Sequence, residues 1–447
     1  MVRPITKTVS NDVTNDEIDV AMKKLRSEVG EKAELRAIER LLFIKMRLQG
    51  VEMSKAMAII GITKPTAYQW QNEWNATGID SIIPDYAGGA PRRLTEEQLQ
   101  EVKDAIAERC MTTEEVQILI EEITKLVAKQ KELGFHAITD GEFRRTFWHL
   151  DFMWGLDGVE HQNTGNGVQF DAELAILDDT YLVGPIRAKA HPFVEYFKFL
   201  KQFEDENTVA KYTIPAPAQT FQQFIVPNNI EGTRKIYPDN EALIQDIAAA
   251  YRDIIRQFYD AGCRNLQLDD CTWGAVVGDA AKHRYKSLGI DIEDVKADLL
   301  KINNLALEGK PDDMVITSHI CRGNYHSTFF TSGPYDSVAD YVFARENVDA
   351  LLLEYDDARS GGFAPLAKVS DDKIVVLGLI TTKSPQLEDK DAVIKRIREA
   401  AKYIPLDRLC LSPQCGFASC EIGNKLTEEE QWAKLRLVKE IAEEVWG

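Results

Sequence analysis

Four short apolar runs toward the C-terminus decide the fold of this chain: MVITSHICRG (314–323), DALLLEYDD (349–357), KIVVLGLITT (373–382) and RLCLSPQCGFAS (408–419). Longer amphipathic stretches separate them, such as KDAVIKRIREAAKYI at 390–404. Short apolar runs that alternate with helical patterns are typical of βαβ units. The C-terminal part of the chain is therefore predicted to be α/β, with a parallel sheet.

The same alternation extends upstream and adds three runs: FHAITDGEF (135–143), KYTIPAPAQTF (211–221) and RNLQLDDCTWG (264–274). Nearly every run ends in polar or reactive side chains. Active-site groups of a (βα)8 barrel gather at the C-terminal ends of its strands, so we predict a TIM-type barrel over 123–447. Seven runs are one short of eight. The first barrel strand is therefore expected to be missing or replaced, and DSIIPDYAGG (80–89) is the only upstream candidate for it.

Residues 31–122 follow a different pattern, in which every periodic segment is helical. MSKAMAII, a turn at 61–63 and KPTAYQWQNEW form a helix-turn-helix pattern, and Pro65 suits the first turn of its second helix. We predict a small all-α domain here, preceded by an N-terminal tail at 1–30.

Composition narrows the class of protein. The 447-residue chain has a formal net charge of -19, which argues against attraction of the whole molecule to nucleic acid or to an anionic membrane. Its 7 cysteines are scattered and odd in number, unlike the disulfide framework of a small secreted protein. The N-terminus has no apolar core like that of a signal peptide, and no apolar run is long enough to span a membrane. We therefore expect a cytoplasmic protein without a membrane partner.

Four residues in the last runs have the donor atoms that zinc prefers. His319 and Cys321 are two residues apart, so on a strand both side chains point to the same face. Glu354 ends the next run, and Cys415 lies just past the last strand. Two thiolates, one imidazole and one carboxylate could complete a tetrahedral Zn²⁺ site, and an incoming thiol could displace the carboxylate. Zinc would deprotonate that thiol, and the thiolate could then attack a methyl group.

Five segments resemble the cobalamin-independent methionine synthase family, and in particular its short members with a single barrel: TDGEFRRTFWHLDFMWGLDGVE, LQLDDCTWG, SHICRGN, LLLEYDD and LSPQCGFAS. The resemblance covers about 123–447. It implies that the four donor residues are zinc ligands, that homocysteine is the methyl acceptor and that methionine is the product. It also implies that Glu142 and Asp269 hold the amino group of the substrate, a role that suits two carboxylates at the mouth of a barrel.

Three further residues at the ends of runs complete the expected substrate contacts: Gln219, Asp270 and Trp273. Long members of the family carry a proton-donating histidine after the seventh strand, where this chain has TTKSPQ. Lys383 in that stretch therefore joins Glu142 and Asp269 as a catalytic candidate.

Two other departures concern the substrates. The Gly-Ser motif of the family's first strand, which contacts the carboxylate end of the substrate, is not found. The duplicated N-terminal half of the long members is also absent. The methyl donor therefore stays open between a methyl-folate, a corrinoid protein and a simpler methylated molecule. The predicted metal ligands lie on the last four strands, which we expect to be well away from the disrupted N-terminal side of the barrel. Metal binding should therefore survive the loss of the first strand better than substrate binding.

The segment LQGVEMSKAMAIIGITKPTAYQWQNEWNATGIDSI, followed by GGAPRRLTEEQ, resembles the helix-turn-helix part of insertion-sequence transposases. The resemblance implies base contacts from Lys64, Thr66, Tyr68, Gln69 and Gln71, and phosphate contacts from Arg92 and Arg93. Near charge balance in this segment disfavours DNA as a partner.

Three alternatives to methyl transfer onto homocysteine stay open. One is zinc-dependent alkyl transfer to another thiol, such as coenzyme M. Another is decarboxylase chemistry of the uroporphyrinogen type on a related barrel. The third is a helix-turn-helix DNA-binding protein with an inactive barrel. The sequence leaves the oligomeric state open, and a partner chain or residues 80–95 are expected to cover the edges of the seven-stranded sheet.

Overall fold

The computed structural model describes five stretches of the chain: residues 31–77, 113–165, 167–170, 174–420 and 422–447. The chain divides into two compact units, Met1–Glu96 and Glu97–Gly447. The N-terminal tail and the candidate strand at 80–89 lie outside the described residues.

Within residues 31–77, the described part of the first unit, the chain forms three helices, α2 (Glu31–Leu48), α3 (Met53–Ile60) and α4 (Lys64–Thr77). Gly61 caps the C-terminal end of helix α3, and its φ of 77° is a left-handed conformation that favours glycine. The three helices enclose a small apolar core of buried side chains: Leu41, Phe43, Ile44, Met53, Ala56, Ala67, Trp70 and Trp74. The predicted helix-turn-helix pattern is therefore present.

The second unit is built on a curled sheet of seven strands: β1 (Ala137–Ile138), β6 (Val209–Pro215), β7 (Asn265–Asp270), β8 (Val315–Ile320), β9 (Ala350–Glu354), β10 (Ile374–Ile380) and β11 (Leu409–Pro413). The strands lie side by side in this order, and each neighbouring pair is parallel. All seven predicted runs supply a strand, so the α/β class and the seven-stranded, TIM-type half-barrel are confirmed.

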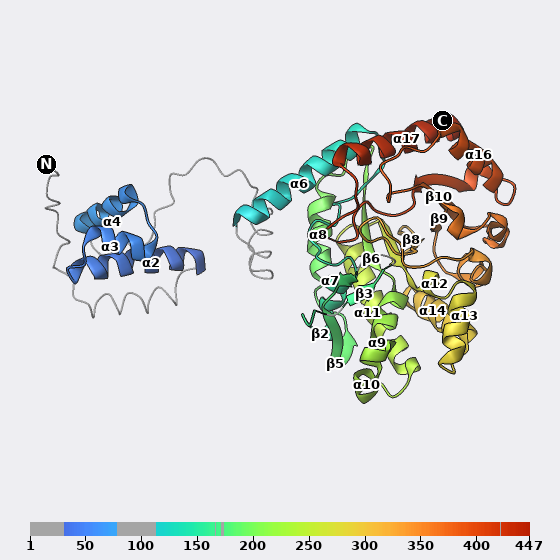
Figure 1. Cartoon of the computed structure of the whole chain (residues 1–447), viewed down its shortest axis with the longest axis horizontal. Helices are drawn as coiled ribbons and strands as arrows, with labels where there is room; N and C mark the ends of the chain where they lie inside the picture. Colours follow the sequence, from blue (N-terminus) through green and yellow to red (C-terminus); the bar gives the residue numbers. More distant parts are fainter. Residues whose placement is uncertain (1–30, 78–112, 166, 171–173, 421) are drawn as a thin grey trace. The chain divides into compact units, whose positions relative to one another are not determined.

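Helices connect and surround these strands (Figure 1). The α-helices of this unit are α6 (Thr113–Glu132), α7 (Leu150–Trp154), α8 (Pro192–Lys201), α9 (Pro217–Ile225), α10 (Pro227–Ile236), α11 (Asn240–Asp260), α12 (Thr272–Ala275), α13 (Gly278–Ser287), α14 (Ile292–Ala306), α15 (Val342–Arg345), α16 (Lys390–Ala400) and α17 (Glu428–Trp446). Short 3₁₀ turns are η2 (Tyr335–Ser337), η3 (Ala358–Ser360), η4 (Ala364–Lys368) and η5 (Leu406–Arg408). Among the described residues, no helix is both long and apolar enough to cross a membrane.

Helix α6 runs without a break through the domain boundary predicted at 122/123, where the sequence pattern indicated a short helix followed by a new unit. The boundary itself stays a prediction. Two antiparallel pairs were not predicted: β2 (Asp157–Gln162) with β5 (Asp179–Arg187), and β3 (Gly167–Gln169) with β4 (Leu174–Ile176). Strand β2 is mostly exposed, so its sequence lacks the apolar alternation that marks a strand.

Strands β1 and β11 form the two ends of the sheet. This order corrects one expectation, because it places β11, the strand before Cys415, beside the missing strand and not away from it. An isolated antiparallel bridge between Phe147 and Cys420 joins the loop after β1 to the loop after β11. Helix α17 packs against β11 and helix α6 against β1. Loops and helices thus connect the two edges where the described chain has no strand.

Alternation along β7 separates a helix-facing side from an interior side. Leu266, Leu268 and Asp270 are fully buried, and Asp270 bonds to Asn303 on α14, so these residues face the helices. Gln267 and Asp269 consequently point to the inside of the curled sheet, where Asp269 is level with His319 of β8.

A close backbone approach at Gly378 yields a test of this sheet. In register, Gly378 is level with Glu354 of β9 and Ser412 of β11. A Cβ at Gly378 would lie 2.7 Å from the Cα of Gln414 and 2.9 Å from the carbonyl oxygen of Leu353. Because both neighbours are backbone atoms, G378A should lower the free energy of unfolding by about 1–3 kcal/mol in a urea titration. The control is G362A, where an added Cβ meets nothing within 4 Å. Equal stability of the two variants would contradict the packing described here.

Candidate metal centre

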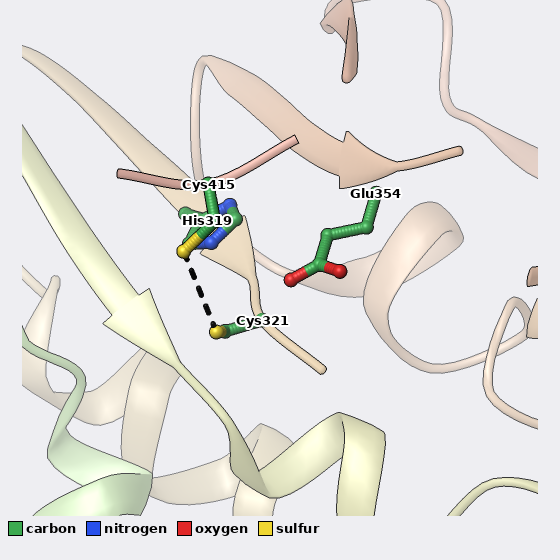
Figure 2. A group of neighbouring side chains, drawn as sticks. All are labelled: His319, Cys321, Glu354 and Cys415. Carbon is green, nitrogen blue, oxygen red and sulfur yellow. Dashed lines mark hydrogen bonds between the residues drawn. The ribbon is translucent and has the colours of Figure 1, made fainter. Parts of the chain in front are cut away.

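Four side chains converge at the carboxyl edge of the sheet (Figure 2). His319 is near the end of β8, Cys321 follows that strand, Glu354 ends β9, and Cys415 follows β11. One ligand atom from each of the four lies within 4.8 Å of the others. The Sγ atoms of Cys321 and Cys415 are 3.9 Å apart. The structure therefore brings together all four predicted donors, from segments almost 100 residues apart.

Three of the four donors are buried, and Cys415 is partly buried. His319 and Cys321 are each 7% exposed, and Glu354 is fully buried. Burial alone would lower the pKa of His319, but the Cys415 thiol and nearby carboxylates raise it to about 9. Burial raises the pKa of Glu354. The pKa values of the Cys321 and Cys415 thiols are also raised well above normal, chiefly by hydrogen bonds to neighbouring thiols and by burial. A divalent cation would reverse these shifts, since it favours the deprotonated ligands.

The donor chemistry fits a metal ion. Within the described residues, His319 Nε2 is buried and has no hydrogen-bond partner. A buried nitrogen in that state normally has a ligand or a donor opposite it. Two thiols, one imidazole and one carboxylate at this spacing match the four-coordinate N/S/O set of zinc sites.

Two residues near this cluster were missed by the sequence analysis. The Cys271 thiol, just after β7, contacts Cys321. Arg359 donates to Glu354 Oε2 at 3.3 Å, while the backbone N–H of Arg322 donates to Glu354 Oε1 at 2.8 Å. The sequence offered one signal for each residue. Cys271 lies within the family-like segment LQLDDCTWG, and Arg359 follows Glu354 by five residues.

The carboxylates of Glu142 and Asp269 lie near the four candidate metal donors, which are called the metal cluster below. Glu142, in the loop after β1, accepts a hydrogen bond from the Thr213 hydroxyl and pairs with Arg145 Nη1 at 3.1 Å. Burial raises the pKa of Glu142 to about 7, and the charge of Asp269 adds to this effect. Asp269 also raises the pKa of His319. Asp269 therefore lies close enough to act on both Glu142 and the metal cluster.

Two further predicted site residues, Gln219 and Lys383, lie on separate elements of the fold. Gln219, on α9, has a buried Oε1 without a hydrogen-bond partner among the described residues. Lys383 donates to Asp356 Oδ2 at 3.1 Å and lowers the pKa of Glu354. Its ammonium group is thus already paired beside the metal cluster.

The structure places two predicted substrate contacts, Asp270 and Trp273, in buried packing. Asp270 faces the helices, where its carboxylate accepts from the backbone N–H of Thr272 at 2.8 Å and from Asn303 Nδ2 at 2.9 Å. Trp273 is fully buried, and its ring centroid lies 6.4 Å from that of Tyr341. Side chains alternate along a strand, so Asp270 cannot share the interior with Asp269. Both roles stay predictions, and the helix-side position of Asp270 disfavours its own.

One predicted base contact in the helix-turn-helix unit is also corrected. Gln71 is fully buried, and its Oε1 accepts from Arg47 Nε at 3.2 Å, so it belongs to the packing between α2 and α4. Arg92 and Arg93 lie outside the described residues. The other predicted base-contacting residues are exposed or half-buried: Lys64, Thr66, Tyr68 and Gln69.

Comparison with known proteins agrees with both units. The family model described as "Cobalamin-independent synthase, Catalytic domain" matches residues 229–444, and "Winged helix-turn helix" matches residues 40–100. The chain is 45% identical over 364 residues to "Uncharacterized protein YxjH" of Bacillus subtilis (strain 168), which covers 81% of this chain and 94% of the relative.

Solved and curated methionine synthases are also similar. A solved structure from Listeria monocytogenes, described as a "Putative Vitamin-B12 Independent Methionine Synthase", has a TM-score of 0.59 and 37% identity, covering 81% of this chain and 98% of that one. The 5-methyltetrahydropteroyltriglutamate–homocysteine methyltransferase of Thermosynechococcus vestitus is 22% identical over 91% of this chain, which spans only 48% of that protein. The high coverage of the first relatives and the catalytic-domain match establish that this chain belongs to the cobalamin-independent methionine synthase family.

Proposed function

We propose that this chain binds one zinc ion and transfers a methyl group to the thiol of homocysteine, forming methionine. The observation that carries the proposal is the convergence of His319, Cys321, Glu354 and Cys415 within 4.8 Å, in a chain of the methionine synthase family. Bound there, zinc supplies the positive charge that keeps a substrate sulfur in its nucleophilic thiolate form at neutral pH.

The residues of the chain itself bind and orient the amino acid. Asp269 and Glu142 offer two carboxylates to the substrate ammonium group, beside the cluster that would hold its sulfur. Arg145 and Thr213 keep Glu142 in place. An amino acid whose ammonium and sulfur are both held has few remaining orientations, which favours attack in line with a methyl group.

The methyl donor is left open between a methyl-folate, a corrinoid protein and a simpler methylated molecule. The curated homocysteine methyltransferase named above acts, by its name, on a methylated pteroyl-triglutamate, but this chain spans about half its length. A panel of the three donor classes, each assayed with homocysteine and with coenzyme M, tests donor and acceptor together. Methylation of coenzyme M alone would favour the alternative thiol, and no methylation of any thiol would contradict the proposal.

The winged helix-turn-helix match supports a second candidate, DNA binding by the first unit. Its test is binding of duplex DNA, which should weaken steeply as the salt concentration rises. DNA binding without turnover of any thiol would favour a DNA-binding protein with an inactive barrel.

Zinc content tests the ligand set. The purified chain should contain about one zinc, and C415S should lose most of it because a hydroxyl is a poor replacement for a thiolate ligand. The control is C410S, which changes an exposed thiol on β11, the same strand that leads to Cys415. Metal analysis by mass spectrometry measures both. Full zinc content in C415S would remove Cys415 from the ligand set.

Asp269 should affect substrate binding and not the metal. Loss of a charged partner of the ammonium group in D269N should raise KM for homocysteine about 10–100-fold, while zinc content stays that of the wild type. D313N is the control, since Asp313 pairs with Arg264 before β8, at the opposite end of that strand. Unchanged KM in D269N would argue against an ammonium site at this carboxylate.

Ionisation of Glu142 should make stability depend on pH. Its pKa is raised from 4.5 to about 7 in the folded chain, so the folded state holds this proton more tightly than the unfolded state. The contribution of Glu142 to stability is therefore most favourable below about pH 4.5 and is lost as the pH rises through about 7.

The glutamine variant E142Q has no such titration. The unfolding free energy of E142Q minus that of the wild type should increase by on the order of 2 kcal/mol between about pH 5 and pH 8. Urea titrations at both pH values measure it, with E195Q as a control at an exposed glutamate of α8. A constant difference would mean that Glu142 is ionised over the whole range.

A further inference from the structure

Glu354 differs from the other three donors in its immediate surroundings. Its Oε2 lies 3.3 Å from Arg359 Nη2, and both side chains are almost fully buried, at 0% and 6% exposure. Its Oε1 accepts from the backbone N–H of Arg322 at 2.8 Å. Figure 2 shows the Glu354 carboxylate pointing toward the thiol side of the cluster. Both oxygens of this one ligand therefore have protein partners that compete for the electron pairs a metal ion would use.

Arg359 is fixed by contacts that do not involve Glu354. Its Nη2 donates to Asp356 Oδ1 at 2.9 Å, and its Nε donates to both carboxylate oxygens of Asp357 at 2.9 Å. The guanidinium also lies over the Phe329 ring, 4.5 Å from its centroid. These contacts would hold the guanidinium in place if the Glu354 carboxylate moved.

Arg359 also has hydrogen-bonding capacity to spare. Its Nη1 is buried and has no hydrogen-bond partner among the described residues. Lys383, bound to the other oxygen of Asp356, adds a second positive charge beside Glu354. A carboxylate released from the cluster would find here a buried, preformed cationic partner, which is where a carboxylate is most stable away from a metal.

A cationic partner weakens a carboxylate as a metal ligand. It withdraws electron density from the donor oxygen and repels the metal ion, whereas the usual partner of a metal-bound histidine accepts a hydrogen bond and strengthens the ligand. In the described part of the chain, the hydrogen bonds and ion pairs of His319, Cys321 and Cys415 include no arginine or lysine. The asymmetry singles out Glu354.

We propose that Arg359 is a positioning residue that makes Glu354 the exchangeable ligand of the cluster. It weakens the bond of Glu354 to the metal and receives the carboxylate when a substrate thiol takes its place. With zinc held by the four donors, a substrate thiol would replace the Glu354 carboxylate as a ligand and would release its proton to solvent. The inference rests on the proposed function, because it assumes a zinc ion at these four residues.

The test compares R359M with the wild-type chain in two equilibrium measurements. Zinc affinity is measured without thiol, by competition with a chromophoric chelator, and homocysteine affinity is measured by titrating the zinc-loaded protein. Without the competing cation, R359M should bind zinc about tenfold more tightly and homocysteine about tenfold more weakly, the scale typical of outer contacts to metal ligands. Opposite signs are expected because the thiol must displace Glu354.

A double-mutant cycle assigns the effect to Glu354. In an E354A background, R359M should leave the affinity for zinc unchanged, because the competition has been removed. R408M serves as the matched control, since Arg408 is a partly buried arginine at the opposite end of β11 and pairs with Asp371. If R359M does not fold, R359K should show the same signs with smaller changes.

The outcomes separate this inference from the proposed function. Weaker zinc binding in R359M, or no change, would overturn the inference, because Arg359 would then orient Glu354 as a ligand or have no effect on it. A wild-type chain that binds zinc and methylates homocysteine would leave the proposed function standing in that case. A wild-type chain that binds no zinc would overturn both.

Discussion

The parallel register of the seven strands is the constraint on which the metal centre depends. Register places Asp269 level with His319, and Glu354 level with Gly378. Parallel strands end at the same edge of a sheet, so donors from β8, β9 and the segment after β11 meet there without a long loop. A slip of one residue in β8 would turn His319 toward the helices and leave the cluster without its imidazole. The close backbone contacts of Gly378 with its neighbours help to fix this register.

The carboxylates on the two faces of the sheet have different surroundings. On the helix side, Asn303 Nδ2 donates to both Asp270 and Glu346 at 2.9 Å, and burial raises the pKa of Glu346 to about 8. One amide thus links two acids in a closed, fully buried network. On the interior side, Glu142, Asp269 and the four candidate metal donors lie near one another. A gathering of titratable groups with shifted pKa values is typical of a functional site, and the interior side combines it with the four candidate metal donors.

The open side of the half-barrel lies beside the site. Strand β11 leads to Cys415, strand β1 leads to Glu142, and these two strands form the ends of the sheet. The bridge between Phe147 and Cys420 links the loops that carry these residues. The positions of Cys415 and Glu142 therefore depend on how the edges are held together. In a closed barrel, a further strand would lie between β11 and β1.

The sequence by itself determined the seven strands and pointed to the four side chains that the structure brings together as candidate metal donors. Short apolar runs followed by His-x-Cys, Glu and Cys are local patterns, and such patterns can be recognised from the sequence without the fold. Only the tertiary structure decided which face each carboxylate occupies. Asp269 and Asp270 are neighbours in sequence, but pleating sends one to the interior and the other to Asn303. Gln71, predicted as a base contact, and Trp273, predicted as a substrate contact, are both fully buried. Arg359, which the sequence did not single out, is a partner of Glu354. These outcomes depend on packing between segments far apart in the chain, and no local pattern encodes which of two faces a neighbouring element will cover.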